Sequence, residues 1–63
     1  MSDRHKQIIE MMSKNNTISA KQLASALNVS SRTIERDIEK MTALKIIERK
    51  GADRGGFWKI IEN

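Results

Sequence analysis

Residues 28–38 read NVSSRTIERDI, and this stretch decides how the chain folds. Asn28 tolerates the left-handed backbone of a tight turn, and Ser30 is a favourable N-terminal cap for a helix that follows it. Val29 and Ile34 have the spacing of the two apolar residues that pack together around such a cap. The stretch therefore predicts a tight turn that leads directly into a capped helix.

A second capped helix is expected just before this turn. Ser19 and Gln22 have the spacing of a capping box, in which each side chain bonds the backbone N–H of the other residue. Ile18 and Leu23 flank that box as apolar residues. Two capped helices joined by residues 28–30 form a helix-turn-helix.

The helix after the turn is expected to run from about Ser31 to Leu44 and to have two contrasting faces. At about 100° per residue, its buried stripe consists of Ile34, Ile38, Met41 and Leu44. The opposite side carries a basic ridge, formed by Arg32, Arg36 and Lys40. Glu35 and Glu39 are expected on one side of this ridge and Asp37 on the other, so that acidic groups dilute the ridge without covering it.

A helix before this pair and a hairpin after it complete the predicted fold. Apolar spacing predicts the first helix over residues 3–14, with Ile8 and Met12 on its inner face. Residues 46–50 and 57–61 are typical of strands, and the glycine-punctuated loop 51–56 joins them. Trp58 is expected in the core rather than as a base-stacking platform. The prediction is a mainly helical domain with a small antiparallel hairpin.

Composition excludes several classes of function. The chain has 63 residues, 38% of them hydrophobic, so we expect one small domain. It has no cysteine and a single histidine, too few for a thiolate nucleophile, a disulfide or a His-based metal site. No apolar run approaches the roughly 20 residues of a membrane span. We expect no enzyme, no cofactor or metal, no membrane partner and no small-molecule ligand.

The charge balance indicates a polyanionic partner. Twelve Lys and Arg residues against eight Asp and Glu give a net charge of +4. Net charge alone fits nucleic acid or an anionic membrane surface, and an outward basic stripe on an arbitrary helix is most often just a solvated face. Inside a helix-turn-helix the same stripe favours double-stranded DNA, because the helix needs a basic, polar face to enter the major groove.

The residues expected to contact DNA come from three places in the chain. Ser31, Arg32, Thr33 and Arg36 are expected in the major groove, where the two arginines either read guanine edges or bind phosphate. Lys40 and the hairpin are expected on the flanking backbone, with Lys21 in the first turn of the second helix. The full set is Lys21, Ser31, Arg32, Thr33, Arg36, Lys40, Arg49 and Arg54.

The order of these elements resembles a winged-helix domain, in which the hairpin is the wing. Residues 29–38 resemble the V-S-x-R-T-I-x-R-D-I recognition-helix signature of bacterial winged helices of the DeoR type. Residues 46–49 (IIER) and 53–60 (DRGGFWKI) are similar to a narrower group. That group is the C-terminal winged helix of bacterial transcriptional regulators with a Schlafen-type divergent AAA domain, often labelled RecG-related helicases.

The narrower resemblance implies a DNA-reading module excised from a larger cytoplasmic, nucleoid-associated bacterial regulator. Residues 1–63 would form one winged helix-turn-helix domain, with the helix over 31–44 in the major groove and the wing loop 51–56 on the flanking backbone. Any homodimer would form through the parent protein. No ATPase activity is expected, because loop 51–56 lacks the Gly-Lys-Ser/Thr ending of a phosphate-binding loop.

An alternative of another class remains open at this stage. Some winged helices are protein-docking modules, and Glu35, Asp37 and Glu39 would suit such a surface. A dimerisation module is a further alternative, with the face formed by Phe57 and Ile61 as the contact. Salt dependence separates these alternatives from DNA binding, which weakens steeply as salt rises.

Overall fold

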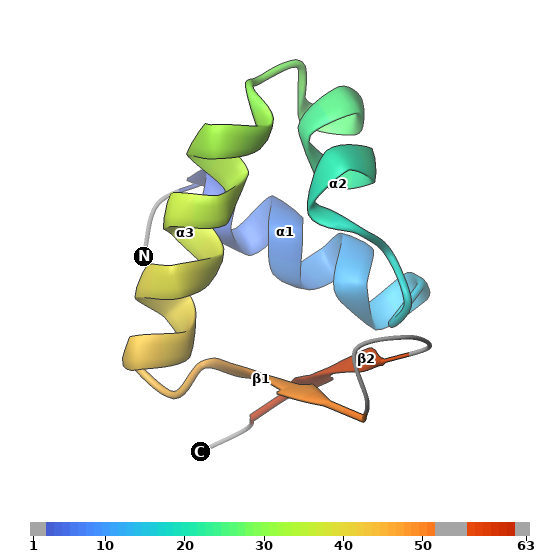
Figure 1. Ribbon diagram of the computed structural model, residues 1–63, viewed down its shortest axis with the longest axis vertical. Helices are drawn as coiled ribbons and strands as arrows, with labels where there is room; N and C mark the ends of the chain where they lie inside the picture. The colour runs from blue at the N-terminus through green and yellow to red at the C-terminus, as the bar shows by residue number, and fades with distance from the viewer. Residues whose placement is uncertain (1–2, 52–55, 62–63) are drawn as a thin grey trace.

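Three helices are followed by a two-stranded antiparallel hairpin (Figure 1). The computed structural model describes residues 3–51 and 56–61. The elements, in chain order, are α1 (Asp3–Lys14), α2 (Ala20–Leu27), α3 (Ser31–Ala43), β1 (Ile47–Lys50) and β2 (Phe57–Ile60). This is the mainly helical architecture expected from the sequence, and it fits a winged helix.

The turn between α2 and α3 is built as the local sequence predicts. Asn28 adopts the left-handed conformation, with φ 57° and ψ 45°, and its N–H bonds carbonyls of the last turn of α2. The N–H of Val29 reaches the Ala24 carbonyl at 3.0 Å, which reverses the chain out of the helix. Ser30 then caps α3, its hydroxyl oxygen accepting the Thr33 N–H at 3.2 Å.

The capping box at the start of α2 is also confirmed. The Gln22 N–H donates to the Ser19 hydroxyl at 3.0 Å, and the Ser19 N–H donates to the Gln22 side-chain oxygen at 2.9 Å. Both bonds satisfy backbone donors that an uncapped helix leaves without partners. They define where α2 begins and therefore how it enters the turn toward α3.

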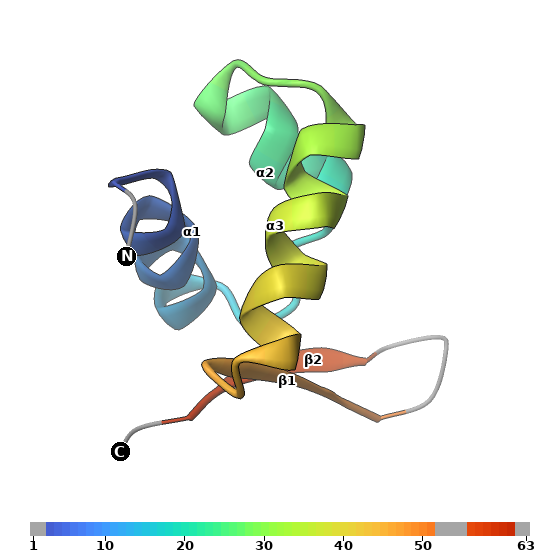
Figure 2. The same ribbon diagram turned by 90° about the vertical axis from the view of Figure 1, so that its left-hand side faces the viewer.

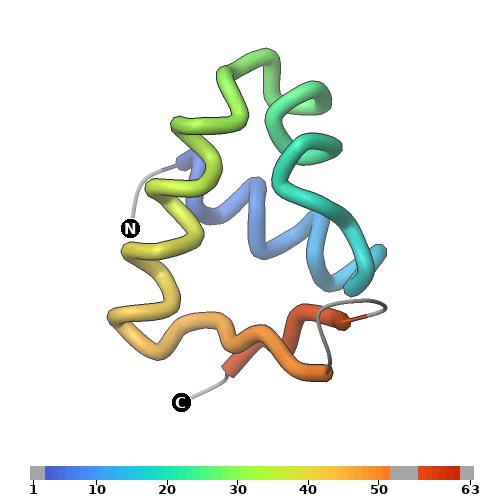
Figure 3. The backbone as a smooth tube through the Cα atoms, in the orientation of Figure 1, coloured from blue at the N-terminus to red at the C-terminus, as the bar shows by residue number. Residues whose placement is uncertain are grey.

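The core lies where the three helices and the hairpin meet. In Figure 1, α1 passes behind α2 and α3, and the hairpin lies below all three helices. Figure 2 shows α1 on one side of α3, and Figure 3 shows the backbone turning sharply from α3 into the hairpin. The buried apolar residues are Ile8, Met12, Ile18, Leu23, Ala24, Ile34, Met41, Ile47 and Trp58. Every element therefore contributes to one core.

Trp58 joins the hairpin to the rest of the domain. Its indole N–H donates to the Ile18 carbonyl at 2.7 Å, and its backbone N–H donates to the Asn16 carbonyl at 2.7 Å. The two strands pair with Ile47 opposite Ile60 and Arg49 opposite Trp58. The prediction that Trp58 belongs to the core is confirmed, since 7% of the residue is exposed.

The end of α3 differs from the sequence prediction. Leu44 was expected in the buried stripe, and this is wrong: it is 60% exposed. The helix ends at Ala43, and Lys45 takes a left-handed φ of 59°. The N–H of Ile46 then returns to the Met41 carbonyl at 2.9 Å. Because this reversal turns the chain away from the helical path, Leu44 leaves the core face.

Smaller differences concern the strands and Ile38. β1 and β2 are each one residue shorter than expected, because Ile46 and Ile61 lie outside the strands. Ile38, which was placed in the buried stripe, is half-buried and packs against the edge of the core.

Candidate nucleic-acid interface

The basic ridge of α3 (Arg32, Arg36 and Lys40) is exposed, opposite the buried Ile34 and Met41. Ser31, at the start of the same helix, is exposed too. In the described part of the chain, none of the three basic side chains forms a salt bridge. Their charges are therefore available to a polyanion that approaches this face.

Thr33 lies beside the ridge and is held by the cap of α3. It is half-buried, and its hydroxyl lies 2.9 Å from the Ser30 hydroxyl while its N–H bonds the same oxygen. The side chain thus contributes to the helix start and borders the exposed face at the same time. Its predicted DNA contact stays a prediction.

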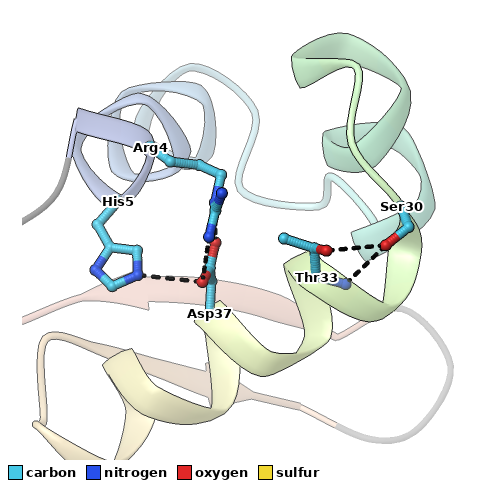
Figure 4. A network of polar contacts seen from close by, with 5 residues as sticks. All are labelled: Arg4, His5, Ser30, Thr33 and Asp37. Carbon is cyan, nitrogen blue, oxygen red and sulfur yellow. Dashed lines mark hydrogen bonds and ion pairs between the residues drawn. The ribbon is translucent and has the colours of Figure 1, made fainter.

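Asp37 has a different position from the one expected. The helical projection placed it beside the ridge as an exposed diluting charge, and this is wrong: 7% of the residue is exposed. Its carboxylate accepts hydrogen bonds from Arg4 of α1, through Nε and, at 3.1 Å, through Nη2. His5 Nε2 lies 3.3 Å from the same carboxylate. Figure 4 shows both α1 side chains directed at Asp37.

This ion pair changes the electrostatics of α3. Hydrogen bonding to Arg4 holds the pKa of Asp37 below its usual value, with His5 adding to the effect and burial opposing it. The same bond raises the pKa of Arg4. Because α1 neutralises Asp37, only Glu35 and Glu39 remain as exposed acidic groups on α3.

A shallow hollow borders α3 on the side of α1, and we call it the α1 flank. Its lining includes Arg4 from α1 and Thr33, Arg36, Asp37 and Lys40 from α3. Arg36 and Lys40, two predicted DNA contacts, therefore share one surface with Thr33. Arg4 joins them, and sequence reasoning missed it because its partner Asp37 is 33 positions away along the chain.

A second hollow borders α3 on the side of the hairpin, and we call it the wing flank. Its lining includes Glu35, Ile38 and Glu39 from α3 with Arg49 and Trp58 from the hairpin. The Arg49 guanidinium lies 4.8 Å from the centroid of the Trp58 ring, a cation–π contact. Arg49 thus covers the outer face of the core tryptophan, and its predicted DNA contact stays a prediction.

The remaining predicted contacts are spread over other elements. Lys21 is exposed in the first turn of α2. Lys50, the neighbour of Arg49 in β1 and not one of the predicted contacts, is paired with Glu48 at 3.0 Å. Arg54 lies outside the described residues. Among residues 3–51 and 56–61, no group of three His, Cys, Asp or Glu side chains could hold a metal ion. No helix there is long and apolar enough to cross a membrane.

Fold and surface together define the class of protein. Two capped helices at a tight turn, a first helix behind them and a hairpin after them make a helix-turn-helix domain that fits the winged-helix arrangement. A family model described as an HTH domain matches residues 4–56, and the chain belongs to that family. Membership indicates DNA binding. No curated protein and no solved structure matches the chain.

Proposed function

We propose that this domain binds double-stranded DNA with α3 in the major groove and serves as the DNA-reading module of a transcriptional regulator. One observation carries the proposal: the basic ridge of α3, on the helix that follows the turn, is exposed and forms no salt bridge with the carboxylates of residues 3–51 and 56–61. That helix is the one a helix-turn-helix domain inserts into the groove. Ser31, Arg32, Thr33 and Arg36 would lie in the major groove, where the two arginines either read guanine edges or bind phosphate, and Lys40 would face the backbone.

The wing and α2 would add contacts to the flanking backbone. Lys21 and Arg49 are exposed on these elements, and Arg54 belongs to the loop between the strands. The similarity of residues 46–49 and 53–60 to the C-terminal winged helix of RecG-related bacterial regulators supports the wider part of the proposal. In it, residues 1–63 are one domain of such a regulator and place its other domains on DNA. No catalytic role is proposed.

A titration with duplex DNA at several salt concentrations tests DNA binding. If six phosphates are neutralised, the logarithm of the binding constant falls with the logarithm of salt concentration with a slope of about −5. In an amide-resolved NMR titration, the shifts should concentrate at residues 30–40. Shifts on α1 and the hairpin face alone, insensitive to salt, would contradict the proposal.

Variants of the basic ridge assign the roles of its side chains. Arg36→Ala should weaken binding to all sequences and reduce the salt slope by about 1 if Arg36 binds phosphate. If it reads a guanine edge, the loss is about 1–3 kcal/mol and confined to particular base pairs. Lys45→Gln, an exposed lysine beyond the end of α3, is the control for the loss of one charge.

The alternative of a docking or dimerisation module gains little support from the exposed apolar residues. The large hydrophobic side chains exposed in the described part of the chain are Leu44 and Phe57. Leu44 precedes the start of β1, whereas Phe57 pairs with Lys50 at its end, so a strand's length separates them. Isolated apolar side chains of this kind are normal on a soluble domain. Sedimentation at two concentrations would detect self-association directly.

A further inference from the structure

Arg4 belongs to α1, outside the helix-turn-helix, yet its guanidinium lies on the same hollow as Arg36 and Lys40 of α3. The described residues therefore bring three cationic side chains from two helices to one surface, the α1 flank. Thr33 adds a hydroxyl to the same lining. Several donors converging on one hollow are what a phosphate group needs.

The Arg4 guanidinium is held in one orientation. Nε and Nη2 donate to the two oxygens of Asp37, so one edge of the planar group is fixed by a carboxylate that is itself buried. The Arg4 side chain keeps 41% of its surface exposed. An arginine held by one edge still offers the N–H groups on Nη1, and its geometry suits bidentate contact with phosphate oxygens.

The immediate charges around Arg4 leave the α1 flank positive. Asp37 and Arg4 compensate each other, and His5 faces the same carboxylate. Arg36 and Lys40 add two positive charges, and Glu39, also on the lining, subtracts one. A phosphate above this hollow would meet a preorganised guanidinium rather than a freely moving one, which lowers the ordering cost of the contact.

We infer that Arg4 binds a backbone phosphate of the duplex together with Arg36 and Lys40, and that Asp37 is a positioning residue which aims the Arg4 guanidinium at that phosphate. The inference rests on the proposed DNA binding of α3. It extends the interface from the helix-turn-helix onto α1, so that one DNA strand runs over the junction of α1 and α3.

Asp37→Asn gives the sharpest test, because the two interpretations of Asp37 predict changes of opposite sign. The substitution removes a negative charge from a DNA-binding surface, so simple electrostatics predicts tighter binding. If Asp37 positions Arg4, the substitution weakens the two hydrogen bonds that hold the Arg4 guanidinium, and it lowers affinity for a short duplex by about threefold. Tighter binding by Asp37→Asn would overturn the inference.

A pair of further variants, Arg4→Gln and Lys6→Gln, keeps the test valid if Asp37→Asn does not fold. Arg4→Gln should lower affinity about tenfold and reduce the salt slope by about 1. Lys6→Gln removes the same charge from an exposed residue about 200° around the same helix, and should change affinity less than about twofold. Equal losses from the two variants would show that Arg4 contributes only general charge, which overturns the inference.

The same titrations separate this inference from the proposed function. If Arg36→Ala weakens binding and Arg4→Gln matches Lys6→Gln, the DNA-binding function holds and the Arg4 contact is wrong. If the wild-type domain does not bind the duplex at low salt, the proposed function itself fails. Circular dichroism at the titration temperature should first show that each variant has the wild-type helix content.

Discussion

The two flanks of α3 join the helix to its neighbours by different chemistry. On the α1 flank the contact is ionic, because the buried Asp37 accepts hydrogen bonds from Arg4 and faces His5. On the wing flank the contact is aromatic, because Trp58 packs into the core and Arg49 covers its ring. The charges differ as well: Asp37, on the α1 flank, is neutralised, whereas Glu35, on the wing flank, and Glu39, which lines both flanks, stay exposed.

This comparison suggests that the two sides of α3 have different roles. With Asp37 neutralised, the free charges of Arg36 and Lys40 on the α1 flank outweigh the one charge of Glu39, so the phosphates are expected there. The wing flank is lined by both exposed glutamates, Glu35 and Glu39, so a close phosphate would be repelled more strongly there. Stability should therefore depend most on the aromatic contact, and DNA affinity on the ionic one.

The largest effect is expected from Trp58→Ala. The substitution removes a buried indole together with its hydrogen bond to the Ile18 carbonyl, and should cost about 3–5 kcal/mol. A domain of this size rarely has more than about 3–5 kcal/mol of total stability, so the variant should be largely unfolded by circular dichroism. Phe57→Ala, at an exposed neighbour in the same strand, is the control and should cost less than about 1 kcal/mol. A cooperative, wild-type-like unfolding transition for Trp58→Ala would contradict the importance of the wing contact.

Asp37→Asn should have a smaller effect on stability. Its partner Arg4 is partly exposed, so the cost lies between the values for a surface pair and a buried pair, at about 1–2 kcal/mol. Urea unfolding followed by Trp58 fluorescence measures it, because the tryptophan is retained. Glu10→Gln breaks the exposed pair with Lys14 and should cost less than about 0.5 kcal/mol. Equal costs for the two variants would mean that the α1 flank contributes no more than a surface pair.

The pH dependence of the free energy of unfolding should show the contribution of the Asp37 carboxylate. Arg4 lowers the pKa of Asp37 in the folded domain below the value of about 3.9 that an unfolded aspartate has. The contribution of Asp37 to stability is therefore fully present above that unfolded value and is lost as pH falls through the folded pKa. The free energy of unfolding should fall more steeply below about pH 4 in the wild type than in Asp37→Asn. If the free energies of unfolding of the wild type and Asp37→Asn fall in parallel from pH 6 to pH 2.5, this prediction is wrong.

The two flanks also differ in how far sequence alone could predict them. Ser19, Asn28 and Ser30 act on residues a few positions away, so their caps and turn were predicted correctly. The period of α3 likewise places Arg32, Arg36 and Lys40 on the outer face. All of these follow from local geometry.

Two features could not be predicted from the sequence, the burial of Asp37 and the exposure of Leu44. The first depends on contacts between distant positions, and the second on a turn whose residues do not signal it. Asp37 is buried only because α1 presents Arg4 and His5 to it, and helical periodicity contains no information about that partner. Leu44 is exposed because Lys45 adopts a left-handed conformation, which glycine or asparagine usually signals and lysine does not. Arg4, the site residue that was missed, likewise depends on a contact with a distant position.

The smallest effect is expected from Glu35→Gln, which probes the wing flank without touching the core. Glu35 is exposed and lines that flank, so removing its charge relieves repulsion of nearby phosphates across solvent. Affinity for a short duplex should rise about twofold to threefold at low salt, and the gain should shrink at moderate salt. Glu10→Gln, on the exposed side of α1, is the matched charge control and should change affinity less.

A loss of affinity confined to duplexes with particular cytosines would instead assign Glu35 to a base edge, since a carboxylate accepts from cytosine N4. Because Asp37→Asn removes the same charge from the other flank and is expected to weaken binding, opposite signs for the two variants would show that the flanks differ in function as well as in structure.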